Sequence, residues 1–178
     1  VVIVKDKGIE ELIDAFLVLS KKYPEMRLLL VGRFEEEGNP ISPATKTVRD
    51  SNDAIIAPGP QKNIPEILSI TDVFVFPSYR EGFGLSLMEA GAMGVPSVST
   101  DIIGCNEIVI DGETGVLMPS HSSSAVVNAI EKLYTDPCLL ESMREKCRAS
   151  IVNRYESKKL IEKYMEFYGS LNADLNKI

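Results

Sequence analysis

Short apolar runs alternate along the chain with segments whose apolar residues recur at helical spacing, and this alternation constrains the fold more than any other feature. Residues 27–31, 54–57 and 115–118 are runs of strand length that lack the polar alternation of a half-exposed strand. Such runs are typical of strands covered on both faces. Residues 9–17 instead place apolar side chains on one helical face: Ile9, Leu12, Ile13, Phe16 and Leu17. The pattern predicts an α/β fold in which helices cover both faces of a parallel sheet.

The same alternation continues to the end of the chain. Strands are expected at residues 1–4, 27–31, 54–57, 72–77, 96–100 and 115–118, and helices at residues 9–23, 64–69, 85–93, 125–134 and 156–175, with two more helices beginning at Ser42-Pro43 and Asp136-Pro137. Residues 32–42 are expected to form a polar loop. The sequence has no internal repeat and no linker, so residues 1–178 are expected to form a single domain. Because the chain starts abruptly within its first strand, we expect it to be a fragment of a longer protein.

Composition and charge exclude several classes of protein. The 178 residues are 44% hydrophobic and 25% charged, which is ordinary for one folded domain and argues against disorder. The longest apolar runs fall well short of the ~20 residues that span a bilayer. The net charge of −7 argues against a broad nucleic-acid surface. The three cysteines lack metal-ligand or disulfide-framework spacing and the chain opens without a leader pattern, so we expect a cytoplasmic protein.

One glycine-containing stretch, SYREGFGLSLMEAGAMGVP at residues 78–96, follows an expected strand and leads into an expected helix. In parallel α/β folds, ligands bind beyond the carboxyl ends of the strands, where loops turn into helices. The backbone N–H groups of Gly82, Phe83, Gly84 and Leu85 have no partner within the helix that follows. Glycine lets a ligand approach the main chain closely, and a helix N-terminus favours an anion. The stretch therefore predicts a site for a phosphate or diphosphate.

Two carboxylates flank this loop. Glu81 precedes the glycines, whereas Glu89 lies just over one turn inside the expected helix. A carboxylate has two acceptor oxygens and suits a vicinal diol, and a nucleotide sugar presents diols on both sides of its diphosphate. A plainer interpretation stays open at this point. Glu89 would then only stabilise the helix N-terminus, and the glycines would only form a tight turn.

The residues around these carboxylates resemble a known family. Glu81-Gly-Phe-Gly-Leu-Ser-Leu-Met-Glu89 is similar to the E-x7-E motif of retaining GT-B glycosyltransferases, specifically the family 4 group that uses nucleotide-sugar donors. Further segments agree with the family: Lys7-Gly8-Ile9, residues 29–32 (LLVG), residues 72–78 (DVFVFPS) and residues 104–115. Together they cover about residues 5 to 170. The resemblance implies the C-terminal, donor-binding half of a two-domain enzyme, with a Rossmann-like sheet and with the N-terminal acceptor domain absent.

The resemblance also implies roles for individual residues. By it, Glu89 binds the ribose hydroxyls, Glu81 contacts the donor sugar as nucleophile or as positioner, and Lys7 neutralises a phosphate. Phe83, Gly84 and Leu85 would present N–H groups to the diphosphate, and the nucleobase would lie near Gly32 and residues 57–63. Lys7 and the helix N-terminus would stabilise the leaving diphosphate in the transition state.

The resemblance implies no metal held by the protein and no cofactor, since the nucleotide sugar is the substrate. The sequence agrees with the absence of a metal site, because it has one histidine and no Asp-x-Asp motif. We expect that histidine, His121, to be a solvated loop residue. The expected partners are a nucleotide-sugar donor and the protein's own N-terminal domain, with peripheral membrane association of the full-length protein and no nucleic acid. In one respect the sequence departs from the family. Val2 occupies the register of an arginine that normally assists the diphosphate, so either the cation is lost or the fragment begins inside the motif.

Two other functions keep the same fold. A nucleotide-sugar epimerase would release free sugar without an acceptor, and a binding module would hold the donor without turnover. A dehydrogenase that uses NAD is disfavoured, because no strand is followed by G-x-G-x-x-G with an acidic residue about 20 positions later. The nucleobase, the sugar and the acceptor are not encoded in any motif of this chain.

Overall fold

The computed structural model describes residues 2–175, in which helices and strands alternate as the sequence predicts. In chain order the elements are β1 (Val2–Ile3), the 3-10 helix η1 (Lys5–Lys7), α1 (Ile9–Lys22), β2 (Leu28–Val31), β3 (Arg33–Phe34), α2 (Pro43–Ser51), β4 (Ile55–Gly59), α3 (Ile64–Ser69), β5 (Phe74–Phe76), α4 (Leu85–Ala92), β6 (Ser97–Thr100), β7 (Gly115–Met118), α5 (Ser123–Thr135), α6 (Pro137–Tyr155) and α7 (Ser157–Leu175). The strand β7 and the helix α3 have the bounds expected from the sequence.

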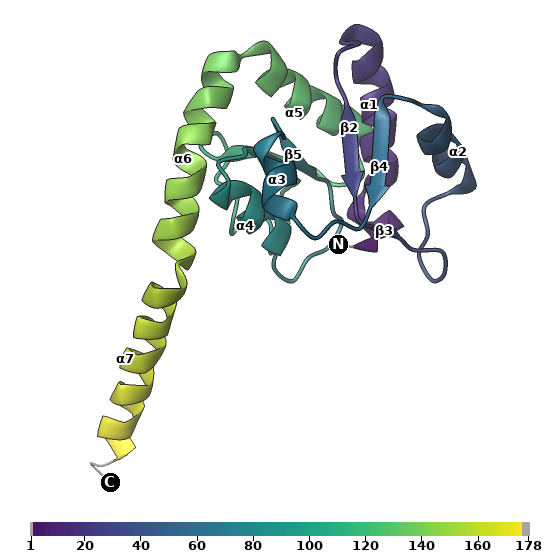
Figure 1. The fold of residues 1–178 in the computed structure, drawn as a ribbon. Coiled ribbons are helices and arrows are strands. Elements are labelled where there is room, and N and C mark those ends of the chain that lie inside the picture. The colour runs from purple at the N-terminus through teal and green to yellow at the C-terminus, as the bar shows by residue number, and fades with distance from the viewer. Residues whose placement is uncertain (1, 176–178) are drawn as a thin grey trace.

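All strand pairs are parallel, which confirms the predicted fold class (Figure 1). The strands pair in three sets, β1 with β3, β2 with β4, and β5 with β6 and β7. Parallel pairing brings the carboxyl ends of paired strands to one edge, which is where the loop after β5 lies. The fold thus gathers loops from distant parts of the sequence at that edge.

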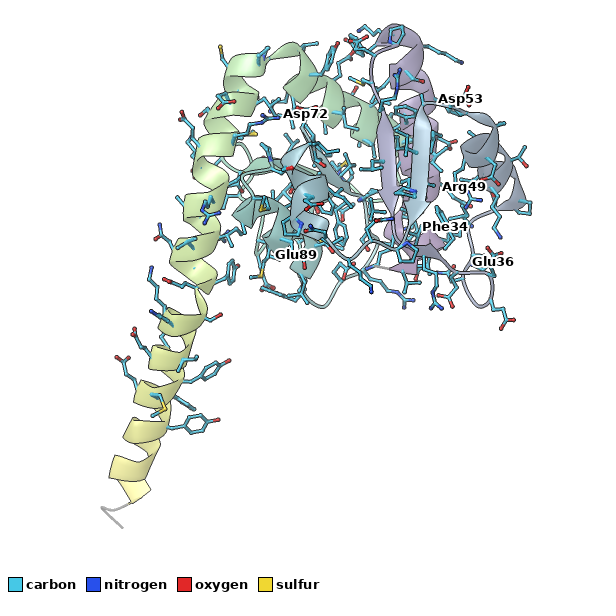
Figure 2. The ribbon with its side chains drawn as sticks, viewed as in Figure 1. Phe34, Glu36, Arg49, Asp53, Asp72 and Glu89 are labelled. Atoms are coloured by element: carbon cyan, nitrogen blue, oxygen red, sulfur yellow. The ribbon has the colours of Figure 1, made fainter. Side chains whose placement is uncertain are left out.

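The strand β3 is the one element that the sequence interpretation assigned wrongly, since residues 32–42 were expected to form only a polar loop. Residues 33 and 34 instead pair with β1, with Ile3 opposite Phe34. The guanidinium of Arg49, on α2, lies 4.3 Å from the centre of the Phe34 ring, and both residues are labelled in Figure 2. A strand of two residues has no periodicity to read, so only its tertiary partners reveal it.

Three apolar cores hold the helices to the strands, the smallest formed by Leu68, Ala90 and Val95. The largest core lies where α1 and α5 pack over the strands, and it includes Ile13, Leu30, Val98 and Leu133. The second core joins β5 and α4 to α6 through Phe76, Leu87 and Ile151, together with Cys105, Ile108 and Val109 of the segment after β6. Helices therefore cover the strands from two sides, as the apolar runs predict.

The last helix, α7, extends away from the rest of the molecule, whereas α6 packs against α4 (Figure 1). The backbone of Glu156 leaves the helical region, with ψ of 126°, and separates α6 from α7. Along α7, residues 161–169 are all exposed, including several large apolar side chains: Ile161, Tyr164, Met165, Phe167 and Tyr168. Within residues 2–175, no helix combines the length and the apolar character needed to cross a membrane.

Candidate functional site

Two segments about 70 positions apart meet at the carboxyl end of β5, namely residues 5–8 and residues 77–81. The Tyr79 N–H donates to the Asp6 carbonyl at 2.8 Å, and the Ser78 hydroxyl oxygen lies 3.3 Å from the same carbonyl oxygen. Gly8 makes this approach feasible, because its φ is +67° and an added Cβ would lie 2.1 Å from the Pro77 carbonyl oxygen. Only glycine fits a position that combines left-handed backbone with such close contact.

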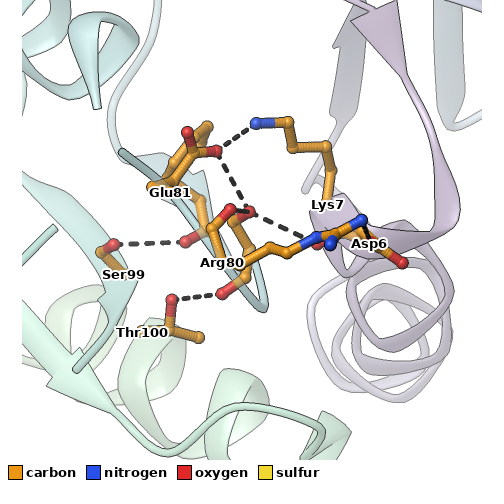
Figure 3. A network of polar contacts seen from close by, with 8 residues as sticks. Asp6, Lys7, Arg80, Glu81, Ser99 and Thr100 are labelled. Carbon is orange, nitrogen blue, oxygen red and sulfur yellow. Dashed lines mark hydrogen bonds and ion pairs between the residues drawn. The ribbon is translucent and has the colours of Figure 1, made fainter. Parts of the chain in front are cut away.

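Lys7 and Glu81 form an ion pair at this meeting point (Figure 3). The Lys7 ammonium donates to Oε1 of Glu81, and the Ser78 hydroxyl donates to the same oxygen at 3.1 Å. The side chains of Lys7 and Glu81 are 27% and 13% exposed, so most of the surface of the pair is shielded from solvent. The Lys7 ammonium also lies 5.3 Å from the centre of the Phe76 ring. The site therefore holds a cation and an anion that are close together, largely shielded and still open to a ligand.

Buried hydroxyl groups fix the backbone beneath the pair. The Thr100 hydroxyl donates to the Ser78 carbonyl at 2.6 Å, and the Ser99 hydroxyl donates to the Phe76 carbonyl at 3.2 Å (Figure 3). Ser78, Ser99 and Thr100 have no exposed surface. Neither Ser99 nor Thr100 belongs to a motif that points to the site. The available signal was the presence of hydroxyl residues in a strand expected to be buried, where each polar group needs a partner.

The glycine loop, residues 81–85, offers fewer unpaired amides than the sequence predicts. The Gly84 N–H donates to the Gly104 carbonyl, and the Leu85 N–H donates to the Phe83 carbonyl, both at 2.9 Å. For the amides of Gly82 and Phe83, residues 2–175 supply no hydrogen-bond acceptor, and both residues are exposed. The described residues thus leave three N–H groups at the start of α4 without an acceptor, those of Gly82, Phe83 and Ser86, whereas those of Gly84 and Leu85 are engaged in holding the loop.

Glu89 differs from Glu81 in its surroundings. It lies on α4, where Figure 2 labels it, and its residue is exposed. Across the part of the chain that the structure describes, no ion pair or hydrogen bond involves its carboxylate. One carboxylate of the motif is thus shielded and paired, whereas the other is exposed and available.

Gly32 lies at the carboxyl end of β2, as the sequence predicts. It is buried, and its N–H donates to the Gly59 carbonyl at 3.2 Å. Gly59 ends β4 and belongs to the 57–63 segment that the family resemblance associates with the base. The two segments assigned to the base are therefore neighbours, although the ion pair of Lys7 and Glu81 involves neither of them.

A second polar cluster, which sequence reasoning missed, lies beside the ion pair. Arg80 pairs with Asp6 at 2.6 Å. A hydrogen bond from Asn39 and the charge of Arg80 hold the pKa of the Asp6 carboxyl below its ordinary value.

Tyr79 contacts two further residues of this cluster. Its ring stacks on His121 with ring centres 3.7 Å apart, and its hydroxyl donates to Glu11 at 2.6 Å. Burial and the Glu11 carboxylate raise the pKa of Tyr79, so it stays protonated.

His121 is exposed, as expected, yet it belongs to this edge of the molecule and not to an unrelated loop. Its φ of +58° is unusual for a residue other than glycine. Among the described residues, three or more His, Cys, Asp or Glu side chains do not gather anywhere in a way that could hold a metal ion.

Comparison with known proteins gives a consistent result. A family model described as "Glycosyl transferases group 1" matches residues 2–150. The capsular polysaccharide biosynthesis glycosyltransferase CapM of Staphylococcus aureus is 33% identical over 171 residues, which is 94% of this chain and 44% of that protein. The chain therefore spans less than half of the length of this relative.

Solved structures have the same fold. HepE of Anabaena, in complex with UDP-glucose, matches with a TM-score of 0.82 and 23% identity, over 94% of this chain and 46% of that chain. The C-terminal domain of LpcC, a glycosyl transferase group 1 family protein of Francisella tularensis, matches with a TM-score of 0.78 and 26% identity. That match covers 88% of this chain and 83% of the LpcC domain.

Proposed function

Because the chain belongs to the glycosyl transferase group 1 family, we propose that it is the C-terminal, donor-binding half of a retaining, family 4 glycosyltransferase with the GT-B fold. The complete enzyme transfers a sugar from a nucleoside diphosphate sugar to a polysaccharide, lipid or small-molecule acceptor. One observation carries the proposal. Lys7, from η1, pairs with Glu81, which directly precedes the unpaired amides of Gly82 and Phe83 in the loop before α4.

The diphosphate binds where these charges and amides meet. Lys7 exchanges Glu81 for a phosphate oxygen when the donor enters, since an ammonium is a point charge that can turn between acceptors. The amides of Gly82 and Phe83 and the N-terminus of α4 add further positive potential. Negative charge grows on the diphosphate as the sugar leaves, so the same groups lower the barrier to transfer. We propose that the donor binds without a metal held by the protein.

Glu81 faces the transferred sugar once Lys7 has turned to the phosphate. The Ser78 hydroxyl and the buried hydroxyls beneath it keep the carboxylate in place, which suits a residue that orients the sugar. We assign Glu81 the role of positioner. Glu89, exposed and unpaired on α4, is available for the ribose hydroxyls, and Gly32 lies beside the segment that would meet the base.

The acceptor belongs to a part of the protein outside this chain. CapM is more than twice as long as the segment it shares with this chain. The LpcC structure is described as a C-terminal domain and matches over most of its length. These comparisons support a separate N-terminal domain. We propose a cytoplasmic enzyme, peripherally associated with the membrane, in which that domain also contacts the exposed apolar face of α7.

Calorimetric titration with UDP, GDP and ADP, without divalent metal, tests the proposal. We expect one nucleotide to bind selectively, and Glu89→Gln to weaken its binding about tenfold because a charge-assisted bond to ribose is lost. Glu141→Gln, an exposed carboxylate of α6, is the matched control and should bind as the unmodified chain does. Failure of all three nucleotides to bind, repeated with a complete homologous enzyme as positive control, would contradict donor binding by this chain.

A further inference from the structure

The last turn of α6 contacts two different parts of the candidate site. Arg154 donates from Nη1 to the Glu107 carbonyl at 2.8 Å and from Nη2 to the Ile108 carbonyl at 2.5 Å. The Tyr155 hydroxyl donates to the same Glu107 carbonyl at 2.6 Å. The planar guanidinium presents two donors in a fixed fork, which neither a lysine nor an apolar residue at position 154 would provide.

These carbonyls belong to residues 102–109, here called the supporting segment. It forms helical turns in which the Ile108 and Val109 N–H groups both donate to the Cys105 carbonyl. Carbonyls at the end of such turns have no partner within them. Arg154 and Tyr155 supply the missing donors, and Ile151 of the same helix packs in one core with Cys105, Ile108 and Val109. The supporting segment is therefore fixed to α6 by both polar and apolar contacts.

The supporting segment in turn holds the glycine loop. The Gly104 carbonyl accepts the Gly84 N–H at 2.9 Å. Gly104 has φ of +84°. A Cβ there would lie 2.8 Å from the backbone carbonyl oxygen of Gly82 and 2.9 Å from the backbone carbonyl oxygen of Glu81. Tyr155 also contacts the loop directly, because its ring meets the Phe83 ring edge-on, with centres 5.8 Å apart. The loop is thus in contact with residues that α6 anchors and with α6 itself.

From these contacts we infer that Arg154 and Tyr155 are positioning residues that hold the glycine loop 81–85 in its ligand-ready shape. Neither residue needs to touch the donor. Their effect passes from α6 through the Glu107 and Ile108 carbonyls to Gly104, and from there to Gly84, while the Tyr155 ring limits the movement of Phe83. The unpaired amides of Gly82 and Phe83 are oriented as a result. The inference rests on the proposed function only where it concerns the donor.

Amide hydrogen exchange followed by NMR tests the positioning role without any ligand. The Gly84 N–H is the reporter, because its acceptor is the Gly104 carbonyl. Arg154→Lys keeps the charge but loses the fork, and we expect Gly84 to exchange about tenfold faster. Tyr155→Phe keeps the contact with Phe83 and loses only the hydroxyl bond, so we expect a smaller increase. Arg148→Lys is the matched control, since Arg148 on the same helix donates to the Ala92 carbonyl, outside the supporting segment.

Calorimetry with the nucleotide selected above gives the second measurement. We expect Arg154→Lys to weaken nucleotide binding about tenfold while its melting temperature stays equal to that of Arg148→Lys. Unchanged exchange at Gly84 in Arg154→Lys, or an equal increase in Arg148→Lys, overturns the inference. If the unmodified chain binds no nucleotide, the proposed function fails, yet the exchange of Gly84 still decides whether Arg154 and Tyr155 position the loop.

Discussion

The Lys7 ammonium and the Glu81 carboxylate neutralise each other although 74 positions separate them in the sequence. A ligand that carries negative charge must therefore compete with Glu81 for Lys7. An unpaired ammonium is unfavourable in a partly desolvated site. The ion pair with Glu81 therefore stabilises the Lys7 ammonium when no ligand is bound.

Removing the Glu81 charge should release Lys7 for phosphate. We expect Glu81→Gln to bind the selected nucleoside diphosphate several-fold more tightly, because the competing carboxylate is gone. Lys7→Met should weaken binding by about tenfold or more, since a charge-assisted bond to phosphate is lost. Isothermal titration measures both. Glu81→Asp, which keeps the charge, is the control, and weaker nucleotide binding by Glu81→Gln would contradict competition for Lys7.

Gly8→Ala should destabilise the fold strongly. The added Cβ would lie 2.1 Å from the Pro77 carbonyl oxygen, at a residue with φ of +67°. We expect a loss of about 3 kcal/mol or more in the free energy of unfolding, measured by urea denaturation. Gly112→Ala has the same left-handed backbone, with φ of +75°, and no atom within 4 Å of the new Cβ. Its cost should be about 1 kcal/mol, the backbone part alone. Equal losses in the two variants would show that contact with Pro77 is unimportant.

Stability should depend on pH through the contact between α1 and α5. The Lys22 ammonium and then the Tyr23 hydroxyl bond to Glu131 and lower the pKa of its carboxyl from the ordinary value of 4.5. A lowered folded-state pKa stabilises the protein above the unfolded pKa, and this contribution is lost as the pH falls through the folded value. The unmodified chain should therefore lose more stability than Glu131→Gln between about pH 5 and pH 3.

Urea denaturation at a series of pH values checks this expectation. The difference in the free energy of unfolding between the unmodified chain and Glu131→Gln should shrink as the pH falls. Glu141→Gln, exposed on α6, serves as the control for loss of a carboxylate in general. A difference that stays constant across the range would mean that the bonds to Glu131 do not affect folding.

Thiol reactivity should distinguish the three cysteines. Cys138 is exposed, whereas Cys105 and Cys147 are buried, and burial raises the pKa of the Cys147 thiol to about 11. Because the thiolate is the reactive form, we expect a disulfide reagent to modify one thiol per native chain and all three in denaturant. In Cys138→Ser the native chain should not react. Rapid modification of two or three thiols in the native chain would contradict the packing around Cys105 and Cys147.

Local pattern was enough to predict most of the elements. The bounds of α3 and β7, the start of α2 at Pro43 after the N-cap Ser42, and the parallel α/β class all follow from the periodicity of apolar residues and from capping residues. The motif from Glu81 to Glu89 also lies within one continuous stretch, so the loop and the helix that follow β5 could be predicted directly. These features depend on residues that are close in the sequence.

Tertiary structure alone decided which groups meet at the site. Lys7 pairs with Glu81, and the Thr100 hydroxyl donates to the Ser78 carbonyl. Arg154 anchors residues that hold the glycine loop. No pattern of neighbouring residues in the sequence predicts any of these contacts. The same holds for the Gly84 amide, which the sequence leaves unpaired and the fold assigns to Gly104. Hydrogen bonds and ion pairs between segments tens of residues apart depend on how strands and helices pack, whereas periodicity reports only which face of each element is buried. The sequence by itself thus determined the class of fold and the position of the glycine loop. Packing determined which charged side chains pair at the site, which amides of the loop stay unpaired and which residues hold the loop in place.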